Sequence, residues 1–156
     1  MSEALAYLDE VVADQQGEGE GEGEKPYDGI VGFSQGASVA ASWLSSRSLA
    51  SLKFAVFLCA ALVPPSKART AQALEESIGS LLAREGEKLD LPTLHVIGER
   101  DVCFGQSERL VGNCEARMAR KVVVAGGGHD VPRDGAVCEA IARAVERVAF
   151  EGISRQ

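Results

Sequence analysis

The chain has 156 residues, of which 46% are hydrophobic. This length and composition exclude a disordered chain and indicate one folded domain, residues 1–156, with a sizeable core. The formal net charge of −7 argues against a nucleic-acid partner and against docking to an anionic membrane surface.

The first third of the sequence predicts two helices around one strand. Apolar residues at helical spacing predict an amphipathic helix over 2–13. The Gly-Glu repeat at 17–24 is typical of a flexible loop, because such a segment cannot offset the entropy lost on ordering. A strand is expected over 27–31 and a helix over 37–49.

The rest of the chain continues the alternation of strands and helices. The apolar run 54–60 is typical of a parallel strand that is covered on both faces. Residues 62–87 contain a proline pair and are expected to form a lid segment. Beyond them, the patterns predict strands over 91–97 and 121–125 and helices over 106–120 and 135–150. Together these elements predict an α/β fold, a parallel sheet of about four strands with flanking helices.

The number and spacing of the cysteines bear on metal binding and on the cellular compartment of the protein. The four cysteines include no closely spaced pair, and the chain has only two histidines, so we expect no metal site. Cys59 lies in an apolar run and Cys138 on an apolar helical face, so both are expected to be buried. We recognise no signal peptide, and no apolar run reaches the length of about 18 residues that a membrane-spanning helix needs. The simplest expectation is a reduced, soluble, cytoplasmic protein.

The stretch Gly32-Phe33-Ser34-Gln35-Gly36 follows an apolar strand and precedes a run of small residues. Strand, Gly-x-Ser-x-Gly and helix, in this order, are the context of a nucleophile elbow. The elbow holds the serine hydroxyl above the sheet, and small residues two positions before and after it let strand and helix pass closely. The backbone N–H of Gln35 would then point at an oxyanion forming on the substrate, which makes Gln35 the expected oxyanion-hole residue.

Two further polar residues follow the carboxyl ends of later strands, where chemistry gathers in parallel sheets. Asp101 follows the third predicted strand and His129 follows the fourth. Ser, Asp, His is the chain order of the catalytic triad in α/β-hydrolases. Because a serine hydroxyl is a weak nucleophile, His129 would take the Ser34 proton and return it to the leaving group, while Asp101 would orient the imidazole.

Each of the three residues also has a plainer interpretation: a helix N-cap for the serine, a turn residue for the aspartate and a surface-loop residue for the histidine. Glu99 is a rival for the acid, but Asp101 is the residue beyond the strand end. His95 falls in mid-strand, so we interpret it as a packed strand residue. Asp130 is expected to cap a turn.

Three segments together resemble the fungal-type serine hydrolase family, the FSH group of α/β-hydrolases. They are Tyr27–Ala37 around the serine, Pro92–Asp101 with the acid and Gly127–Pro132 with the histidine. The resemblance implies esterase or thioesterase activity on a small acyl ester or thioester, free or bound to a carrier protein. This chemistry needs no metal and no organic cofactor. The phrase Gly-Phe-Ser-Gln-Gly also occurs in acyl-protein thioesterases and carboxylesterases, and that branch stays open as an alternative.

The resemblance also implies strands that this sequence does not hold. The family fold begins with several strands before the elbow, and a loop after an early strand supplies the second oxyanion-hole N–H. We therefore expect the C-terminal part of an α/β-hydrolase, with turnover impaired by roughly 10²–10³ when one donor is missing. The elbow strand would form an exposed apolar edge that favours homo-oligomers. A non-catalytic fragment that self-associates is the second alternative.

Overall fold

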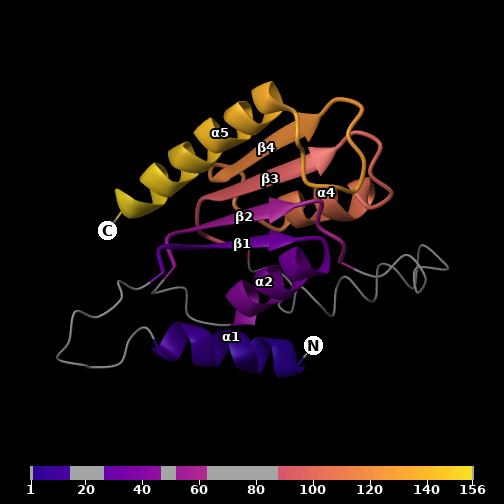
Figure 1. Cartoon of the computed structure of the whole chain (residues 1–156). Helices are drawn as coiled ribbons and strands as arrows, with labels where there is room; N and C mark the ends of the chain where they lie inside the picture. The colour runs from indigo at the N-terminus through magenta and orange to yellow at the C-terminus, as the bar shows by residue number, and fades with distance from the viewer. Residues whose placement is uncertain (1, 15–26, 47–51, 63–87, 156) are drawn as a thin grey trace.

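The computed structural model describes residues 2–14, 27–46, 52–62 and 88–155. These residues form four strands joined by helices (Figure 1). The strands are β1 (Gly29–Phe33), β2 (Phe54–Leu58), β3 (Thr93–Gly98) and β4 (Ala119–Val124). The helices are α1 (Ser2–Asp14), α2 (Gln35–Ser46), α4 (Phe104–Gly112) and α5 (Gly135–Ile153).

The strands lie side by side in chain order, β1-β2-β3-β4, and every neighbouring pair is parallel. The register places Gly32 of β1 opposite Phe57 of β2, and Val96 of β3 opposite Val122 of β4. Because parallel strands end at the same edge of a sheet, the loops that follow them open on one side. The α/β class expected from the sequence is confirmed.

Helices cover both faces of the sheet, α5 on one face and α2 with α4 on the other (Figure 1). Side chains alternate between the two faces along each strand. In β2, Val56 packs on the α5 side in a cluster with Val148 of α5. Ala55 and Phe57 pack on the opposite side in a cluster with Leu44 of α2. The middle of the sheet is therefore apolar on both faces, as in buried parallel sheets.

The helix expected over 106–120 is shorter in the structure, where α4 ends at Gly112. The chain then pairs with Leu89. The Leu89 N–H donates to the carbonyl oxygen of Asn113 at 2.9 Å, and the Glu115 N–H donates to the Leu89 carbonyl at 3.0 Å. These bonds satisfy backbone groups that a continued helix would have used, so the C-terminal half of the predicted helix is wrong.

Other predicted boundaries are displaced by a few residues. The first strand begins at Gly29 rather than at 27, and α2 begins at Gln35, directly after the serine. The second strand ends at Leu58 rather than at 60. The reason is that Cys59 has a φ of +47°, which lies outside the β region.

Some expectations fall outside the described residues, and one is wrong. The 17–24 loop lies outside them, as does the 62–87 lid apart from Leu62. Cys138 is exposed rather than buried, because the first half of α5 has no buried residue and Val148 in its second half packs on the sheet. Within the part of the chain that the structure describes, no helix combines the length and the hydropathy of a membrane span.

The first strand presents an apolar edge. Among the described strands, β1 pairs only with β2. Two of its large side chains, Val31 and Phe33, are 64% and 40% exposed. An edge strand of this kind leaves backbone N–H and C=O groups available for pairing with another chain.

Candidate active site

Ser34 lies at a sharp turn between β1 and α2, in the conformation that a nucleophile elbow requires. Its φ is +53°, a left-handed value that is costly for a residue other than glycine. Three backbone hydrogen bonds stabilise this turn. The Ser34 N–H donates to Leu58 at 2.9 Å, and the N–H groups of Ala37 and Ala61 donate to the Ser34 carbonyl at 3.1 and 3.2 Å.

The two glycines of the elbow have different surroundings. A methyl group on Gly32 would lie 2.6 Å from the α-carbon of Ala37 in α2, as expected for a close approach of strand and helix. Apart from its chain neighbours and the backbone of its own helix, no described residue has an atom within 4 Å of a methyl group placed on Gly36. The packing reason expected for Gly36 is therefore wrong. Instead, Gly36 lines the cavity beside Ser34.

Asp101 follows β3 in a tight turn that orients its carboxylate. The Asp101 N–H donates to the Gly98 carbonyl at 3.1 Å, and its Oδ1 accepts a hydrogen bond from the Cys103 N–H at 2.7 Å. The side chain has no exposed surface. A buried carboxylate in a fixed orientation is suited to orient a neighbouring imidazole.

The loop after β4 carries His129 and is fastened to the end of β3. The Glu99 N–H donates to the Val124 carbonyl at 3.0 Å, and the Arg100 N–H donates to the Gly127 carbonyl at 2.8 Å. These bonds cross between the two loops that carry the acid and the histidine. They set the distance between the two side chains.

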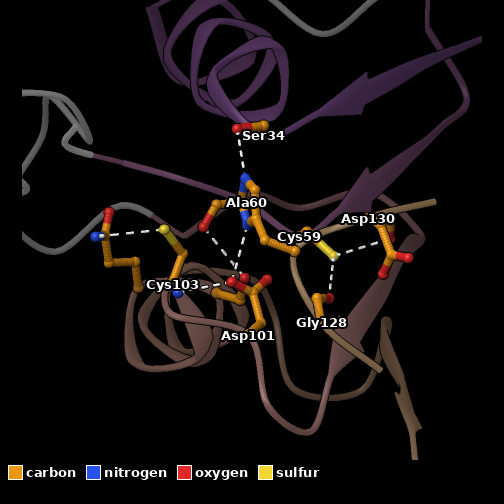
Figure 2. A network of polar contacts seen from close by, with 10 residues as sticks. Ser34, Cys59, Ala60, Asp101, Cys103, Gly128 and Asp130 are labelled. Atoms are coloured by element: carbon orange, nitrogen blue, oxygen red, sulfur yellow. Dashed lines mark hydrogen bonds and ion pairs between the residues drawn. The ribbon is translucent and has the colours of Figure 1, made fainter. Parts of the chain in front are cut away.

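The three residues expected at the strand ends form one hydrogen-bonded row (Figure 2). Ser34 Oγ lies 2.8 Å from His129 Nε2, and His129 Nδ1 lies 2.8 Å from Asp101 Oδ1. An imidazole protonated on Nδ1 donates a hydrogen bond to Asp101 through Nδ1 and accepts one from the Ser34 hydroxyl at Nε2. The side chain of His129 is 28% exposed, whereas that of Asp101 is buried, so the acid lies behind the histidine.

The rival residues lie elsewhere. Glu99 is exposed, and its Oε2 accepts a hydrogen bond from the Gly126 N–H at 2.7 Å, so this carboxylate supports the histidine loop from outside. His95 is 1% exposed and lies 3.1 Å from the Thr93 hydroxyl. Burial lowers the pKa of His95 to about 4. The structure therefore places Asp101, and not Glu99, beside the imidazole of His129.

Cys59 is a further residue at this site, although its apolar neighbours in the sequence predict a place in a strand core. It follows β2 and is 2% exposed. Its Sγ, a carboxylate oxygen of Asp101 and a ring nitrogen of His129 lie within 4.8 Å of one another. Burial and, to a smaller extent, the Asp101 carboxylate raise the pKa of the Cys59 thiol to about 11. The sequence signal that could have found it is its position after a strand, at the same sheet edge as the other three.

These three side chains are of the types that could hold a metal ion. A metal binds the thiolate form of cysteine, and the raised pKa of Cys59 makes loss of the thiol proton more costly. In addition, Nδ1 of His129 is already hydrogen-bonded to Asp101. The donor set therefore does not favour a metal centre.

A cavity of about 380 Å³ opens beside Ser34 and His129. Apolar side chains form much of its wall, including those of Phe33, Ala61 and Val102. The Phe33 ring centroid lies 5.5 Å from that of the His129 imidazole. An apolar cavity next to a serine hydroxyl suits an acyl chain better than a charged group.

The sequence matches the family model described as serine hydrolase (FSH1) over residues 1–141. The chain belongs to this family. Esterase FPY3 of Fusarium mangiferae is 32% identical over 137 residues, covering 85% of this chain and 62% of that protein. Thioesterase FSL2 of Gibberella zeae is 30% identical over 120 residues, covering 75% of this chain and 48% of that protein. The FSH1-family chain thus spans about half the length of the curated relatives that it matches.

Solved structures share the fold of this FSH1-family chain. The monoacylglycerol lipase of Paleococcus ferrophilus aligns with a TM-score of 0.67 at 16% identity, over 96% of this chain and 75% of that one. An esterase of Rhizomucor miehei aligns with a TM-score of 0.59 at 13% identity, over 95% of this chain and 58% of that one. At such low identity the likeness concerns the fold alone, and that fold is an α/β-hydrolase fold.

Proposed function

We propose that the chain is a serine hydrolase that cleaves a carboxylic ester or an acyl thioester through an acyl-enzyme. Ser34 is the nucleophile, His129 the general acid and base, and Asp101 the residue that orients the imidazole. The backbone N–H of Gln35 donates to the oxyanion. The observation that carries the proposal is the pair of 2.8 Å contacts that connects Ser34 Oγ, His129 and Asp101 Oδ1. Family membership supports the reaction class, because the matched relatives are named esterases and a thioesterase.

In the acylation step, Ser34 Oγ bonds to the carbonyl carbon of the substrate while its proton moves to His129 Nε2. The π electrons of the carbonyl move to its oxygen, to which the Gln35 N–H donates a hydrogen bond. Asp101 remains ionised and stabilises the imidazolium. Collapse of the oxyanion then breaks the bond to the leaving group, and His129 transfers the proton to the departing alkoxide or thiolate.

Deacylation repeats these steps with water as the nucleophile. The water oxygen bonds to the acyl carbon of the Ser34 ester, and its proton moves to His129 Nε2. Collapse of the second oxyanion releases the carboxylic acid, and Ser34 Oγ regains its proton from His129. Ester and water yield acid and alcohol, so the balance needs no oxidant, metal or organic cofactor.

The apolar cavity supports an acyl chain as the part of the substrate that binds next to Ser34. The remainder, an alcohol or the thiol of a carrier, would leave through its open side. The FSH1 match does not favour the carboxylesterase or acyl-protein thioesterase branch, nor a non-catalytic role.

A fluorophosphonate probe tests this proposal, since it labels serines that are activated by a neighbouring base. We expect the chain to be labelled at Ser34, as located by peptide mass spectrometry, and to hydrolyse a short-chain p-nitrophenyl ester. Ser34→Ala should lose both activities and keep its circular dichroism spectrum. Ser45→Ala is the matched control, because the Ser45 hydroxyl donates to the Ala41 carbonyl within α2 and contacts none of the three proposed catalytic residues. A parent chain that is neither labelled nor active would contradict the proposal and favour the non-catalytic alternative.

A further inference from the structure

Cys59 contacts the chain on both sides of the proposed general base. Its Sγ lies 3.7 Å from the carbonyl oxygen of Gly128 and 3.5 Å from that of Asp130, the residues directly before and after His129 (Figure 2). Both distances are within reach of an S–H···O hydrogen bond, in which the thiol donates to one carbonyl at a time. Cys59 is only 2% exposed, so its thiol makes these contacts from a buried position.

The same thiol faces the acid. A carboxylate oxygen of Asp101 lies within 4.8 Å of the Cys59 sulfur. Oδ1 of Asp101 is bonded to His129 and to the Cys103 N–H, whereas Oδ2 is buried and has no hydrogen-bond partner among the described residues. The Cys59 thiol thus lies close to the Asp101 carboxylate and to the carbonyl groups of the two residues that flank His129.

The backbone at Cys59 is strained at this point. Its φ of +47° is a value that glycine adopts without cost and that a cysteine adopts only when its surroundings impose it. The Cys59 N–H donates to the Val96 carbonyl at 2.9 Å, which ties the residue to β3. Strain that is retained next to reactive groups often serves to place a side chain. Here the side chain that it places is the thiol.

We propose that Cys59 is a positioning residue: its buried thiol fastens the loop that carries His129 and so keeps the imidazole between Ser34 and Asp101. The inference rests on the proposed function and names a residue that acts through His129 without touching the substrate. Cys114 offers a contrast, because its Sγ contacts the Leu110 carbonyl at 3.3 Å and His95, neither of which belongs to the proposed site.

Three substitutions of Cys59 distinguish the effect of losing the thiol from the effect of relieving the backbone strain. Cys59→Ser keeps a donor and the strained backbone, Cys59→Ala keeps only the strain, and Cys59→Gly removes both. If the thiol positions His129, activity follows the donor, so that Ser exceeds Ala and Gly. If Cys59 has only a packing role, activity follows thermal stability instead, and Gly differs from Ala because it relieves the strain.

The measurements are the second-order rate of fluorophosphonate labelling, kcat and KM for a p-nitrophenyl ester, and the melting temperature. For Cys59→Ala and Cys59→Gly we expect the labelling rate and kcat to fall by roughly tenfold to 100-fold, the range that a small misplacement of a catalytic group produces. KM should change little, because Cys59 does not line the cavity beside Ser34. The low-field proton resonance of the His129 Nδ1–H bonded to Asp101 should broaden. Cys114→Ala is the control for loss of a buried thiol and should keep the labelling rate.

Labelling of Cys59→Ala and Cys59→Gly at the parent rate would overturn the inference, as would a ranking of all variants by melting temperature alone. If Cys59→Gly does not fold, the comparison of Ser with Ala at equal strain still decides the matter. A parent chain without labelling would instead count against the proposed function, so the two failures are distinguishable.

Discussion

The α-carbon of Gly98 lies against the backbone of the histidine loop, so close to the Gly128 carbonyl that no side chain fits between them. A methyl group on Gly98 would lie 2.6 Å from the carbonyl oxygen of Gly127 and closer still to that of Gly128. Gly98→Ala must therefore displace the loop that carries His129. We expect kcat for a p-nitrophenyl ester to fall by about 10²-fold, with a loss of about 1–3 kcal/mol in the free energy of unfolding.

Gly112→Ala is the matched control for this substitution. Gly112 is the last residue of α4. Apart from its chain neighbours and the backbone of α4, no described residue has an atom within 4 Å of a methyl group placed there. This variant should keep the parent activity and at least the parent stability, since alanine favours the helix. Equal activity of the Gly98 and Gly112 variants would show that the loop tolerates the displacement.

The choice of acid is tested by neutral replacements of both carboxylates. Asp101→Asn should lower kcat by roughly 10²–10⁴-fold, because the amide no longer fixes the Nδ1–H tautomer of His129 or stabilises its charge. Glu99→Gln should cost no more than about threefold, since an amide oxygen can still accept the Gly126 N–H that Glu99 binds. The measurement is kcat on the same ester for both variants, and the reverse ranking would identify Glu99 as the acid.

Burial of His95 makes the fold sensitive to acid. The pKa of His95 is lowered to about 4 in the folded chain, against 6.5 when the side chain is free in water. Between these two pH values the unfolded chain binds a proton at His95 that the folded chain does not bind. The contribution of neutral His95 to the free energy of unfolding is therefore complete above pH 6.5 and is lost as pH falls toward 4. The free energy of unfolding should drop by up to about 1.4 kcal/mol per pH unit within this window.

Urea denaturation at a series of pH values between about 6 and 5 measures this slope. His95→Leu removes the titrating group, so its slope should be smaller by the contribution of His95, whatever its absolute stability. Identical slopes for the parent and the variant would mean that His95 is accessible to protons in the folded chain.

The apolar edge of β1 predicts self-association of the chain. Val31 is 64% exposed on a strand that has one neighbour among the described strands. Pairing of this edge with a second chain would satisfy backbone groups and cover apolar surface. We expect dimers or larger species at micromolar concentration by light scattering, and fewer of them for Val31→Lys. Phe150→Lys is the control, since Phe150 is 72% exposed but belongs to α5 and not to β1. A monomer throughout the micromolar range would refute the prediction.

Local patterns in the sequence were sufficient to predict that Ser34, Asp101 and His129 lie together at one edge of the sheet. Each follows an apolar strand, and parallel strands carry the residues after their ends to one edge of the sheet. The Gly-x-Ser-x-Gly stretch adds a backbone requirement that is itself local, as the φ of Ser34 and the close contact at Gly32 illustrate. The α/β class followed from the same alternation of strands and helices. These features depend on neighbours in sequence, and for that reason a single sequence is enough to infer them.

Tertiary contacts decided what no local pattern contains. α4 ends where the chain after it pairs with Leu89. Leu89 is distant in sequence from α4, so no pattern within the helix predicts this end. Which of the two carboxylates, Asp101 or Glu99, contacts Nδ1 of His129 depends on the turn after β3, which directs Asp101 toward the imidazole and Glu99 toward the Gly126 N–H. The role that we infer for Cys59 depends on carbonyl groups about 70 positions away in the chain, brought to its thiol only when β2, β3 and β4 lie side by side. Packing between distant segments sets these distances, and the sequence specifies them only through the complete fold.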